Sequence, residues 1–506
     1  MLRFCQSLRT GRWNVTSLLT VAVCWAVSQL LAAAENEPPK FDGVKAAWHG
    51  FDRYDFIIDE STNQIAPFQT TAQEGDGIGG ALQGKRRCVV VLPKSFAAGR
   101  SWSWRGCYWN HEPQTEIELL KRGFAIAHIT GAPDKYWETW YDFLVEKHGF
   151  SPKPAFIGMS RGGEFSYTWA VRHPDKAACI YADNPGSNPE VFSGLGKLAT
   201  QDVPLLHING SVDPLLNKIS GAIENIYHAL GGRITVVIKE GAGHHPHSLR
   251  NPKFAADFIE KSVNEKRPPK PNFVPERFTK TSYYSAQSFY KEFPDEHNYM
   301  ICRGADFTPV YDRYEFSLPG VEGSIQVVVP NQPAQNGAWV FRATFLDRNE
   351  WVDQTLLENG FAIVTGSIPY NADGARLPHW NIVYKYLTEH GFSAKPVAEG
   401  TGGAASEAIG WAIAHPDKTA CVYLNNPLLR WSFLLEKPIK GHLRPMIDAK
   451  IPIVATTTED APFNDLPEIG VNLLDASGLK EYVQRFTQED RENPDVVKFI
   501  LDAVEK

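Results

Sequence analysis

The chain has 506 residues, of which 43% are hydrophobic and 22% are charged, and its formal net charge is -7. This length predicts about two to four domains, and the composition excludes a disordered or fibrous chain. Because the charge is small and contains no long run of one sign, we expect no binding to nucleic acid or anionic lipid. A small-molecule or carbohydrate partner fits this charge better.

Residues 1–34 have the order of a secretory signal peptide. Three arginines precede an apolar stretch over residues 18–31, which ends in three alanines before polar residues. We therefore expect cleavage after Ala34, a secreted or periplasmic protein, and no membrane contact once the signal is removed. An uncleaved anchor is the alternative, but the stretch is short for a membrane span and is interrupted by Ser28 and Gln29.

Short apolar runs alternate with amphipathic helical patterns between residues 46 and 264. This alternation predicts an α/β domain with a largely parallel sheet and helices on both faces. The expected strands are 88–92, 101–105, 124–129, 155–158, 179–182, 205–208 and 235–239. The expected helices are 113–122, 136–148, 162–172, 219–230 and 252–263.

Sequence phrases of this domain return in the second half of the chain. HGFSPKP at 148–154 returns as HGFSAKP at 390–396, and HPDK at 173–176 returns at 415–418, both 242 residues later (390 − 148 and 415 − 173). Matches that keep one register indicate an internal duplication. We interpret the proline-rich residues 265–281 as a linker and residues 282–506 as a second domain, and we expect the two domains to pack against each other.

The phrase GMSRGG at 158–163 lies between an expected strand and an expected helix. A serine on such a tight turn needs small neighbours, and the turn exposes its hydroxyl and directs the next backbone N–H at a developing oxyanion. The pattern therefore predicts Ser160 as a nucleophile and the N–H of Arg161 as an oxyanion donor. An ordinary loop rich in glycine and serine is the alternative.

A nucleophilic serine needs a base and an orienting acid, expected here in the order Ser, Asp, His. Asp213 follows the expected strand 205–208 and is the preferred acid, while Asp183 is the competing acid. The phrase GAGHHPH ends in three histidines, and its small residues before His244 favour close approach to the serine. We predict His244 as the base, with His245 as the alternative.

Three histidines in four positions have a second interpretation as metal ligands. Pro246 interrupts them, however, and no acidic or cysteine partner lies near them in sequence, so we predict neither a metal site nor a cofactor. His245 and His247 are then interpreted as groups that line a pocket.

Residues around the strand 101–105 complete the predicted site. The second oxyanion donor is expected to be the backbone N–H of Arg105 or Gly106. Several tryptophans gather in the same part of the sequence, where they pack in the core or line a substrate cleft. The residues predicted to contact substrate are Arg161, Trp104, Trp109 and Trp137.

The GMSRGG turn, the later aspartate and the GAGHH loop together resemble the α/β-hydrolase superfamily. Residues 88–263 look like the bacterial esterase and prolyl-oligopeptidase-like groups. The resemblance implies a mostly parallel eight-stranded sheet and acyl-enzyme chemistry, with Ser160, Asp213 and His244 as a catalytic triad. The turn is also similar in part to that of glucuronoyl esterases, G-C-S-R-x-G-K, but Met159 and Glu164 replace its cysteine and lysine.

The expected activity is hydrolysis of carboxylic esters, including carbohydrate-linked esters, through an acyl-serine. A prolyl-type peptidase and a non-catalytic binding protein are the alternatives. The 242-residue register places Gly402 opposite Ser160, and the phrase around Ile451 places Ala461 opposite Asp213. No histidine follows Ile451, so two tandem α/β-hydrolase domains are expected, the second without catalytic residues.

Overall fold

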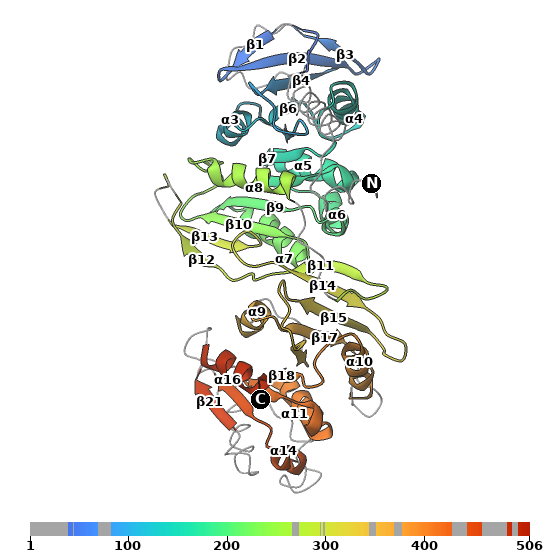
Figure 1. Ribbon diagram of the computed structural model, residues 1–506. Helices are drawn as coiled ribbons and strands as arrows, with labels where there is room; N and C mark the ends of the chain where they lie inside the picture. Colours follow the sequence, from blue (N-terminus) through green and yellow to red (C-terminus); the bar gives the residue numbers. More distant parts are fainter. Residues whose placement is uncertain are drawn as a thin grey trace, which may run out of the picture. The chain divides into compact units, whose positions relative to one another are not determined.

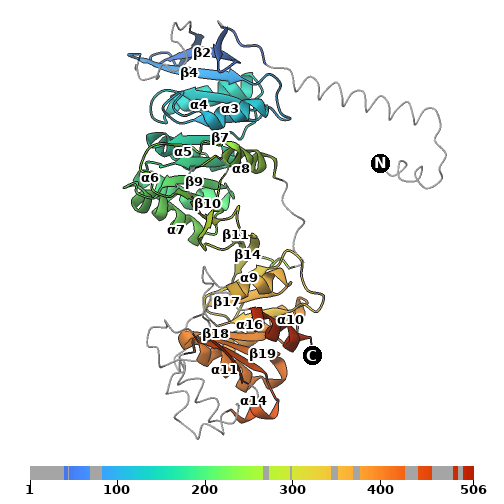
Figure 2. The same ribbon diagram turned by 90° about the vertical axis from the view of Figure 1, so that its left-hand side faces the viewer.

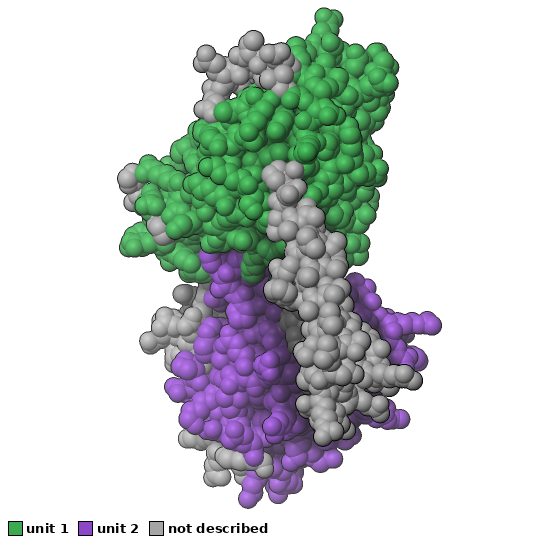
Figure 3. Space-filling model, turned by 45° about the horizontal axis from the view of Figure 1, so that its top comes forward, with its two compact units in different colours: residues 1–266, 289–302 green, residues 267–288, 303–506 purple. Residues whose placement is uncertain are grey.

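The chain consists of two compact units, which Figure 3 shows in different colours. Unit 1 comprises Met1–Lys266 and Phe289–Cys302, and unit 2 comprises Arg267–Ser288 and Arg303–Lys506. The computed structural model describes residues 39–43, 45–68, 82–265, 273–293, 295–296, 299–343, 351–368, 377–427, 443–457, 483–487 and 494–505. The expected signal peptide, part of the expected linker and Ala461 lie outside these residues.

Unit 1 contains a twelve-stranded sheet with the order β1-β2-β4-β6-β5-β7-β8-β9-β10-β13-β12, and β3 pairs with β2 (Figure 1). The strands β6, β5, β7, β8, β9 and β10 run parallel, whereas β2 and β4 pair antiparallel with each other and β4 with β6. The strands are β1 Lys45–Trp48, β2 Phe51–Asp59, β3 Gln64–Pro67, β4 Lys85–Leu92, β5 Trp102–Arg105, β6 Ala125–Ile129, β7 Ala155–Met159, β8 Cys179–Asp183, β9 Leu205–Gly210, β10 Ile234–Lys239, β12 Phe289–Lys291 and β13 Met300–Gly304.

The parallel strands are short and buried along their whole length. Every residue of β6, β7, β8, β9 and β10 is buried, as expected for strands covered on both faces. This burial explains why continuous apolar runs predicted their positions. The strands β1, β2 and β3 were not predicted, since β2 alternates buried and partly exposed residues and contains four charged side chains.

Helices flank the sheet, and their bounds follow the predicted ones closely except for one helix that was not predicted. They are α3 Gln114–Lys121, α4 Lys135–Asp142 with a π-helical turn Phe143–Lys147, α5 Arg161–Arg172, α6 Pro189–Thr200, α7 Gly221–Ala229 after a π-helical turn Leu216–Ser220, and α8 Lys253–Asn264. Helix α6 was not predicted, although Asn188 caps it through the N–H of Val191 and Pro189 opens it. Two glycines weaken its helical signal.

Unit 2 contains a nine-stranded sheet with the order β11-β14-β15-β17-β16-β18-β19-β20-β21. Its strands are β11 Thr279–Tyr283, β14 Tyr311–Phe316, β15 Ser324–Val329, β16 Trp339–Arg342, β17 Ala362–Ser367, β18 Val397–Thr401, β19 Cys421–Asn425, β20 Ile453–Thr457 and β21 Val483–Thr487. Its helices are α9 Trp351–Glu358, α10 Leu377–Glu389, α11 Ala405–Ala414, α14 Arg444–Asp448 and α16 Pro494–Val504, and Figure 2 shows them around the sheet.

The two sheets have the same strand order, and each unit contains a buried ion pair at the equivalent position. The series β2-β4-β6-β5-β7-β8-β9-β10 and β14-β15-β17-β16-β18-β19-β20-β21 place the strands in the same sequence of neighbours. Arg105 at the end of β5 pairs with Glu116, and Arg342 at the end of β16 pairs with Asp353, eleven positions later in both units. The predicted fold class, two tandem α/β-hydrolase domains, is therefore confirmed.

The boundary between the units differs from the expected one. The strands β12 and β13 extend the sheet of unit 1, although they lie in the range expected for the second domain. Exposed aromatic side chains on β12 are unlike the alternating pattern of a core strand, so this part could not be assigned from the sequence. No helix within the described ranges is long and apolar enough to cross a membrane.

Candidate active site

Ser160 lies on the sharp turn that joins β7 to α5. Its backbone is held in a positive-φ conformation, with φ 51° and ψ −123°. The Ser160 N–H donates to the carbonyl of Asp183 at 3.0 Å, and its carbonyl accepts the N–H groups of Gly163 and Gly186 at 2.9 and 2.7 Å. These bonds fix a conformation that a residue with a side chain rarely adopts.

Glycine is required at two positions of this turn. A Cβ on Gly158 would lie 2.3 Å from the carbonyl oxygen of Gly162, and a Cβ on Gly163 would lie 2.6 Å from the side chain of Pro185. Both distances are shorter than real Cβ contacts, so the glycines let the turn close. The physical reason given for the GMSRGG pattern therefore matches the observed contacts.

The structure brings the three predicted triad side chains together at the carboxyl ends of the strands. His244 Nε2 lies 3.1 Å from Ser160 Oγ, and His244 Nδ1 lies 2.9 Å from Asp213 Oδ2. The N–H of Leu215 donates to Asp213 Oδ1 at 2.9 Å, which orients the carboxylate. Because a carboxylate only accepts hydrogen bonds, Asp213 favours the tautomer with the proton on Nδ1 and leaves Nε2 free to accept the serine proton.

Asp183, the competing acid, has a different role. Its Oδ2 accepts the backbone N–H of Ser248 at 2.8 Å and the hydroxyl of Tyr181 at 3.1 Å. Burial raises the pKa of this carboxyl to about 6. Asp183 therefore anchors the end of the histidine loop, and the alternative assignment as the acid next to His244 does not fit these contacts.

Two further residues hold the histidine loop, and neither was predicted. Asn184 donates from Nδ2 to the carbonyl of His244 at 2.9 Å, while its Oδ1 accepts the N–H of Gly210 at 2.9 Å. Lys239 donates from Nζ to the carbonyls of Pro246 at 2.5 Å and Ser248 at 3.1 Å. Their position at the ends of β8 and β10 was the only signal in the sequence, because such bonds form between segments far apart in the chain.

Of the two predicted donors for the second oxyanion contact, Gly106 is already used and Arg105 lies within the sheet. The N–H of Gly106 donates to the carbonyl of Ile157 at 2.9 Å, and Arg105 is paired within the sheet on both sides, opposite His128 and Ile157. The next backbone N–H, that of Cys107, lies beside the turn, since a Cβ on Gly162 would be 3.0 Å from Cys107 N. The Gly106 N–H therefore does not fit the predicted role, and the Cys107 N–H is the next donor along this loop.

The Arg105 side chain organises the loop that carries Cys107. Its buried guanidinium donates to the carbonyls of Cys107 at 2.9 Å and His111 at 2.6 Å, and it pairs with Glu116. A single buried cation thus satisfies several backbone oxygens of the loop 107–111. Arg105 therefore shapes the loop through its side chain, whereas its backbone N–H was the predicted group.

The tryptophans predicted to contact substrate are core residues. Trp104 and Trp137 are fully buried, and their rings stack with centroids 4.7 Å apart. Trp109 is 4% exposed and packs against Trp48 at 5.0 Å. The prediction was wrong for these three residues because an aromatic-rich sequence is equally compatible with core packing. The Arg161 side chain, in contrast, is exposed at the start of α5.

The other two histidines of the loop lie next to the triad. The ring centroids of His245 and His247 are 5.1 and 5.0 Å from that of His244. His245 is exposed, whereas His247 is buried. Burial and then the neighbouring His245 and His244 lower the pKa of His247 to about 3, so its imidazole is neutral near pH 7.

Unit 2 keeps the turn without the hydroxyl. Gly402, opposite Ser160, has φ 55° after β18, close to the 51° of the serine. Glu399 on β18 pairs with the buried Arg342 at 2.8 Å. Ala461, opposite Asp213, lies outside the described residues.

Comparison with known proteins gives distant likenesses only. No family model matches the chain, and no curated protein matches it. Among solved structures, it is similar to Est1E from Butyrivibrio proteoclasticus, with 14% identity over 36% of this chain and 96% of that one and a TM-score of 0.30. It is also similar to a ferulic acid esterase, with 14% identity over 35% and 90% and a TM-score of 0.27.

A third likeness is to FphF, a fluorophosphonate-binding serine hydrolase from Staphylococcus aureus. Here the identity is 11% over 39% of this chain and 98% of that one, with a TM-score of 0.30. The strand order of each sheet and the turn at Ser160, both observed in the chain itself, are the features that give it the α/β-hydrolase fold.

Proposed function

We propose that the chain is a serine hydrolase of carboxylic esters, with the active site in unit 1. The observation that carries this proposal is the continuous hydrogen-bonded series from Ser160 through His244 to Asp213, with distances of 3.1 and 2.9 Å. Serine becomes a useful nucleophile only when a base takes its proton, and this arrangement provides one. No other chemistry is needed to explain the series.

The proposed reaction has two steps with one covalent intermediate. His244 Nε2 takes the proton as Ser160 Oγ attacks the ester carbonyl, and Asp213 stabilises the resulting imidazolium. The oxyanion accepts hydrogen bonds from the backbone N–H of Arg161, the first residue of α5, and from that of Cys107. Return of the proton releases the alcohol, and a water molecule activated by the same histidine then hydrolyses the acyl-serine.

The substrate class is proposed from the residues at the mouth of the site. The exposed Arg161 follows the nucleophile directly, where its guanidinium can bind an anionic or hydroxyl-rich acyl group. A carbohydrate-linked ester fits this position. The enzyme would act on it outside the cell, after removal of residues 1–34. Unit 2 is proposed to be non-catalytic, because Gly402 offers no hydroxyl.

A fluorophosphonate probe tests the activity on the full chain. The proposal predicts one labelled site per chain, which Ser160→Ala removes completely, together with parallel loss of p-nitrophenyl acetate hydrolysis. Thr401→Ala, beside the equivalent turn of unit 2, is the matched control and should keep full labelling. An unreactive wild-type protein would contradict the proposal and favour a binding protein.

A substrate panel then separates the ester classes from peptides. Methyl glucuronate esters, acetylated sugars and peptide anilides should be compared by kcat/KM with the same enzyme preparation. The kcat/KM for esters is expected to be well above that for anilides. A preference for anilides that is also lost in Ser160→Ala would replace the esterase with a peptidase.

A further inference from the structure

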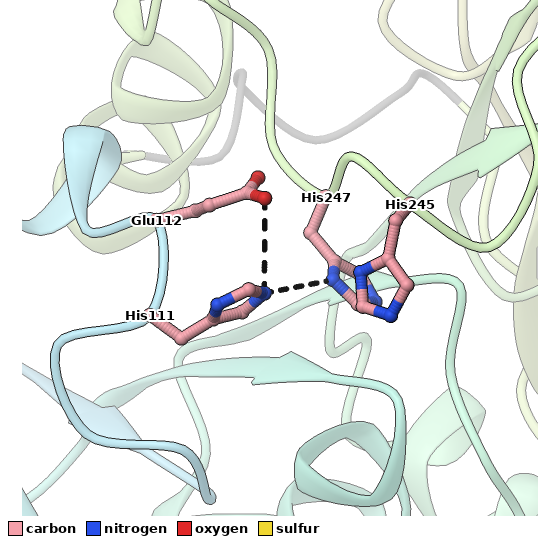
Figure 4. A group of neighbouring side chains, drawn as sticks. All are labelled: His111, Glu112, His245 and His247. Carbon is pink, nitrogen blue, oxygen red and sulfur yellow. Dashed lines mark hydrogen bonds and ion pairs between the residues drawn. The ribbon is translucent and has the colours of Figure 1, made fainter. Parts of the chain in front are cut away.

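A group of metal-binding side chains lies beside the triad, and the proposed reaction uses none of them. One donor atom of each of its four residues lies within 4.8 Å of the donor atoms of the others. Figure 4 shows their side chains directed toward one another from two separate loops. We call this group the histidine cluster; it consists of His111, Glu112, His245 and His247.

The spacing inside the histidine cluster suits a transition metal. His111 Nε2 lies 3.2 Å from His247 Nδ1 and 3.7 Å from Glu112 Oε1. Two nitrogens bound to a tetrahedral Zn²⁺ at its usual bond length are about 3.3 Å apart. The distance between the two histidine nitrogens already matches this separation, and donor atoms that lie farther apart would need to approach each other by up to about 1.5 Å around the ion.

An unsatisfied carboxylate oxygen in the histidine cluster is a second, independent observation. Glu112 Oε2 is buried and has no hydrogen-bond partner among the described residues. Buried polar atoms without partners are rare in folded proteins, and an ion bound by the Glu112 carboxylate would satisfy this oxygen.

Hydrogen bonds from neighbouring side chains hold both loops of the histidine cluster in place. The buried Arg105 holds the carbonyl of His111 at 2.6 Å, and Ser248 Oγ donates to the carbonyl of Glu112 at 3.2 Å. On the other loop, Lys239 holds the carbonyl of Pro246 at 2.5 Å. Both loops are thus fixed by buried groups before any ligand binds, which lowers the entropic cost of forming a site.

We propose that the histidine cluster is a binding site for a transition-metal dication such as Zn²⁺. Three imidazoles and one carboxylate are donors that favour Zn²⁺, Co²⁺ or Ni²⁺ over Mg²⁺ or Ca²⁺. The ion would link the loop 107–112, which carries Cys107, to the loop 241–248, which carries His244. It would therefore fix the relative position of the base and one oxyanion donor while leaving Ser160 unligated.

The metal-free full chain, titrated with Zn²⁺ against a chromophoric chelator, tests this proposal without an activity assay. We expect tight binding of one ion, a higher unfolding temperature with Zn²⁺, no such shift with Mg²⁺, and visible absorption bands with Co²⁺. The double variant Glu112→Gln/His245→Ala should weaken Zn²⁺ binding at least about 10-fold. Neither residue is buried as a whole, so folding should be retained.

His244→Ala is the matched control, because it removes an adjacent imidazole outside the histidine cluster. It should lose ester hydrolysis but keep Zn²⁺ binding and the Co²⁺ spectrum. Unchanged Zn²⁺ affinity in the double variant would overturn the proposal and place the ion among the other histidines of the chain. Loss of binding in His244→Ala would overturn it too, since the ion would then lie on the triad.

Discussion

Replacing Asp213 by asparagine tests the role of the buried carboxylate. The side chain of Asp213 is fully buried, and its Oδ2 is the partner of His244 Nδ1 at 2.9 Å. An amide of the same shape keeps the packing but removes the charge, and its NH₂ group favours the tautomer with the proton on Nε2. That nitrogen then cannot accept the serine proton. We expect kcat to fall about 10³–10⁴-fold, equivalent to about 4–5.5 kcal/mol of transition-state stabilisation.

Asp183→Asn is the matched control for this measurement. It is the same chemical change on the neighbouring strand, but Asp183 binds Ser248 and Tyr181 rather than the histidine. An asparagine can still accept the Ser248 N–H, so we expect kcat to remain within about tenfold of wild type. Initial rates with p-nitrophenyl acetate and urea unfolding of each variant separate catalysis from stability. Asp213→Asn with more than a tenth of wild-type activity, or an equal loss in both variants, would refute the reasoning.

Three further predictions follow from the same contacts. Gly158→Ala should lower the unfolding free energy by about 1–3 kcal/mol and abolish hydrolysis, because its Cβ would lie 2.3 Å from the carbonyl oxygen of Gly162. The control Gly196→Ala has open space around it inside helix α6 and should not destabilise the chain in the same unfolding experiment. Asn184→Asp keeps a residue that tolerates positive φ but removes the donor to the His244 carbonyl, so kcat should fall about 10-fold or more with little change in KM. His207 is buried with a pKa lowered to about 3, so it contributes stability above pH 6.5 that is lost as the pH falls toward 3. In His207→Asn, the loss of unfolding free energy between pH 7.5 and 5 should be about 2 kcal/mol smaller than in wild type; an unchanged loss would show that His207 titrates normally.

Local features of the sequence were enough to predict the central part of unit 1. Each parallel strand is a short run buried on both faces, so its apolar residues are continuous in sequence. The glycine at 158 avoids a contact of 2.3 Å with the carbonyl oxygen of Gly162, which ties the turn at Ser160 to a local pattern. Asp213 and His244 followed from chain order, because parallel strands bring their carboxyl ends to one edge.

Other features were decided by contacts between distant segments. Arg105 and Gly106 were reasonable oxyanion donors until the pairing of β5 with β7 used the Gly106 N–H. The aromatic side chains of Trp104 and Trp137 would suit a substrate cleft, and only their stacking inside the core excludes that role. The local sequence cannot distinguish a role in the site from a role in the core or the sheet, because the role depends on which distant residues the folded chain brings next to these side chains.

The histidine loop shows this division most directly. From the sequence, GAGHHPH predicted a base at His244, and the absence of a nearby acid argued against a metal. In the folded chain, Glu112 and His111 reach the same place from a loop more than 130 positions earlier, and His111 Nε2 lies 3.2 Å from His247 Nδ1. The sequence by itself therefore determined the parallel strands of unit 1 and the turn that holds Ser160, because both depend on neighbouring residues. Only the tertiary structure decided which side chains surround them, because those contacts form when the sheet brings separate loops together.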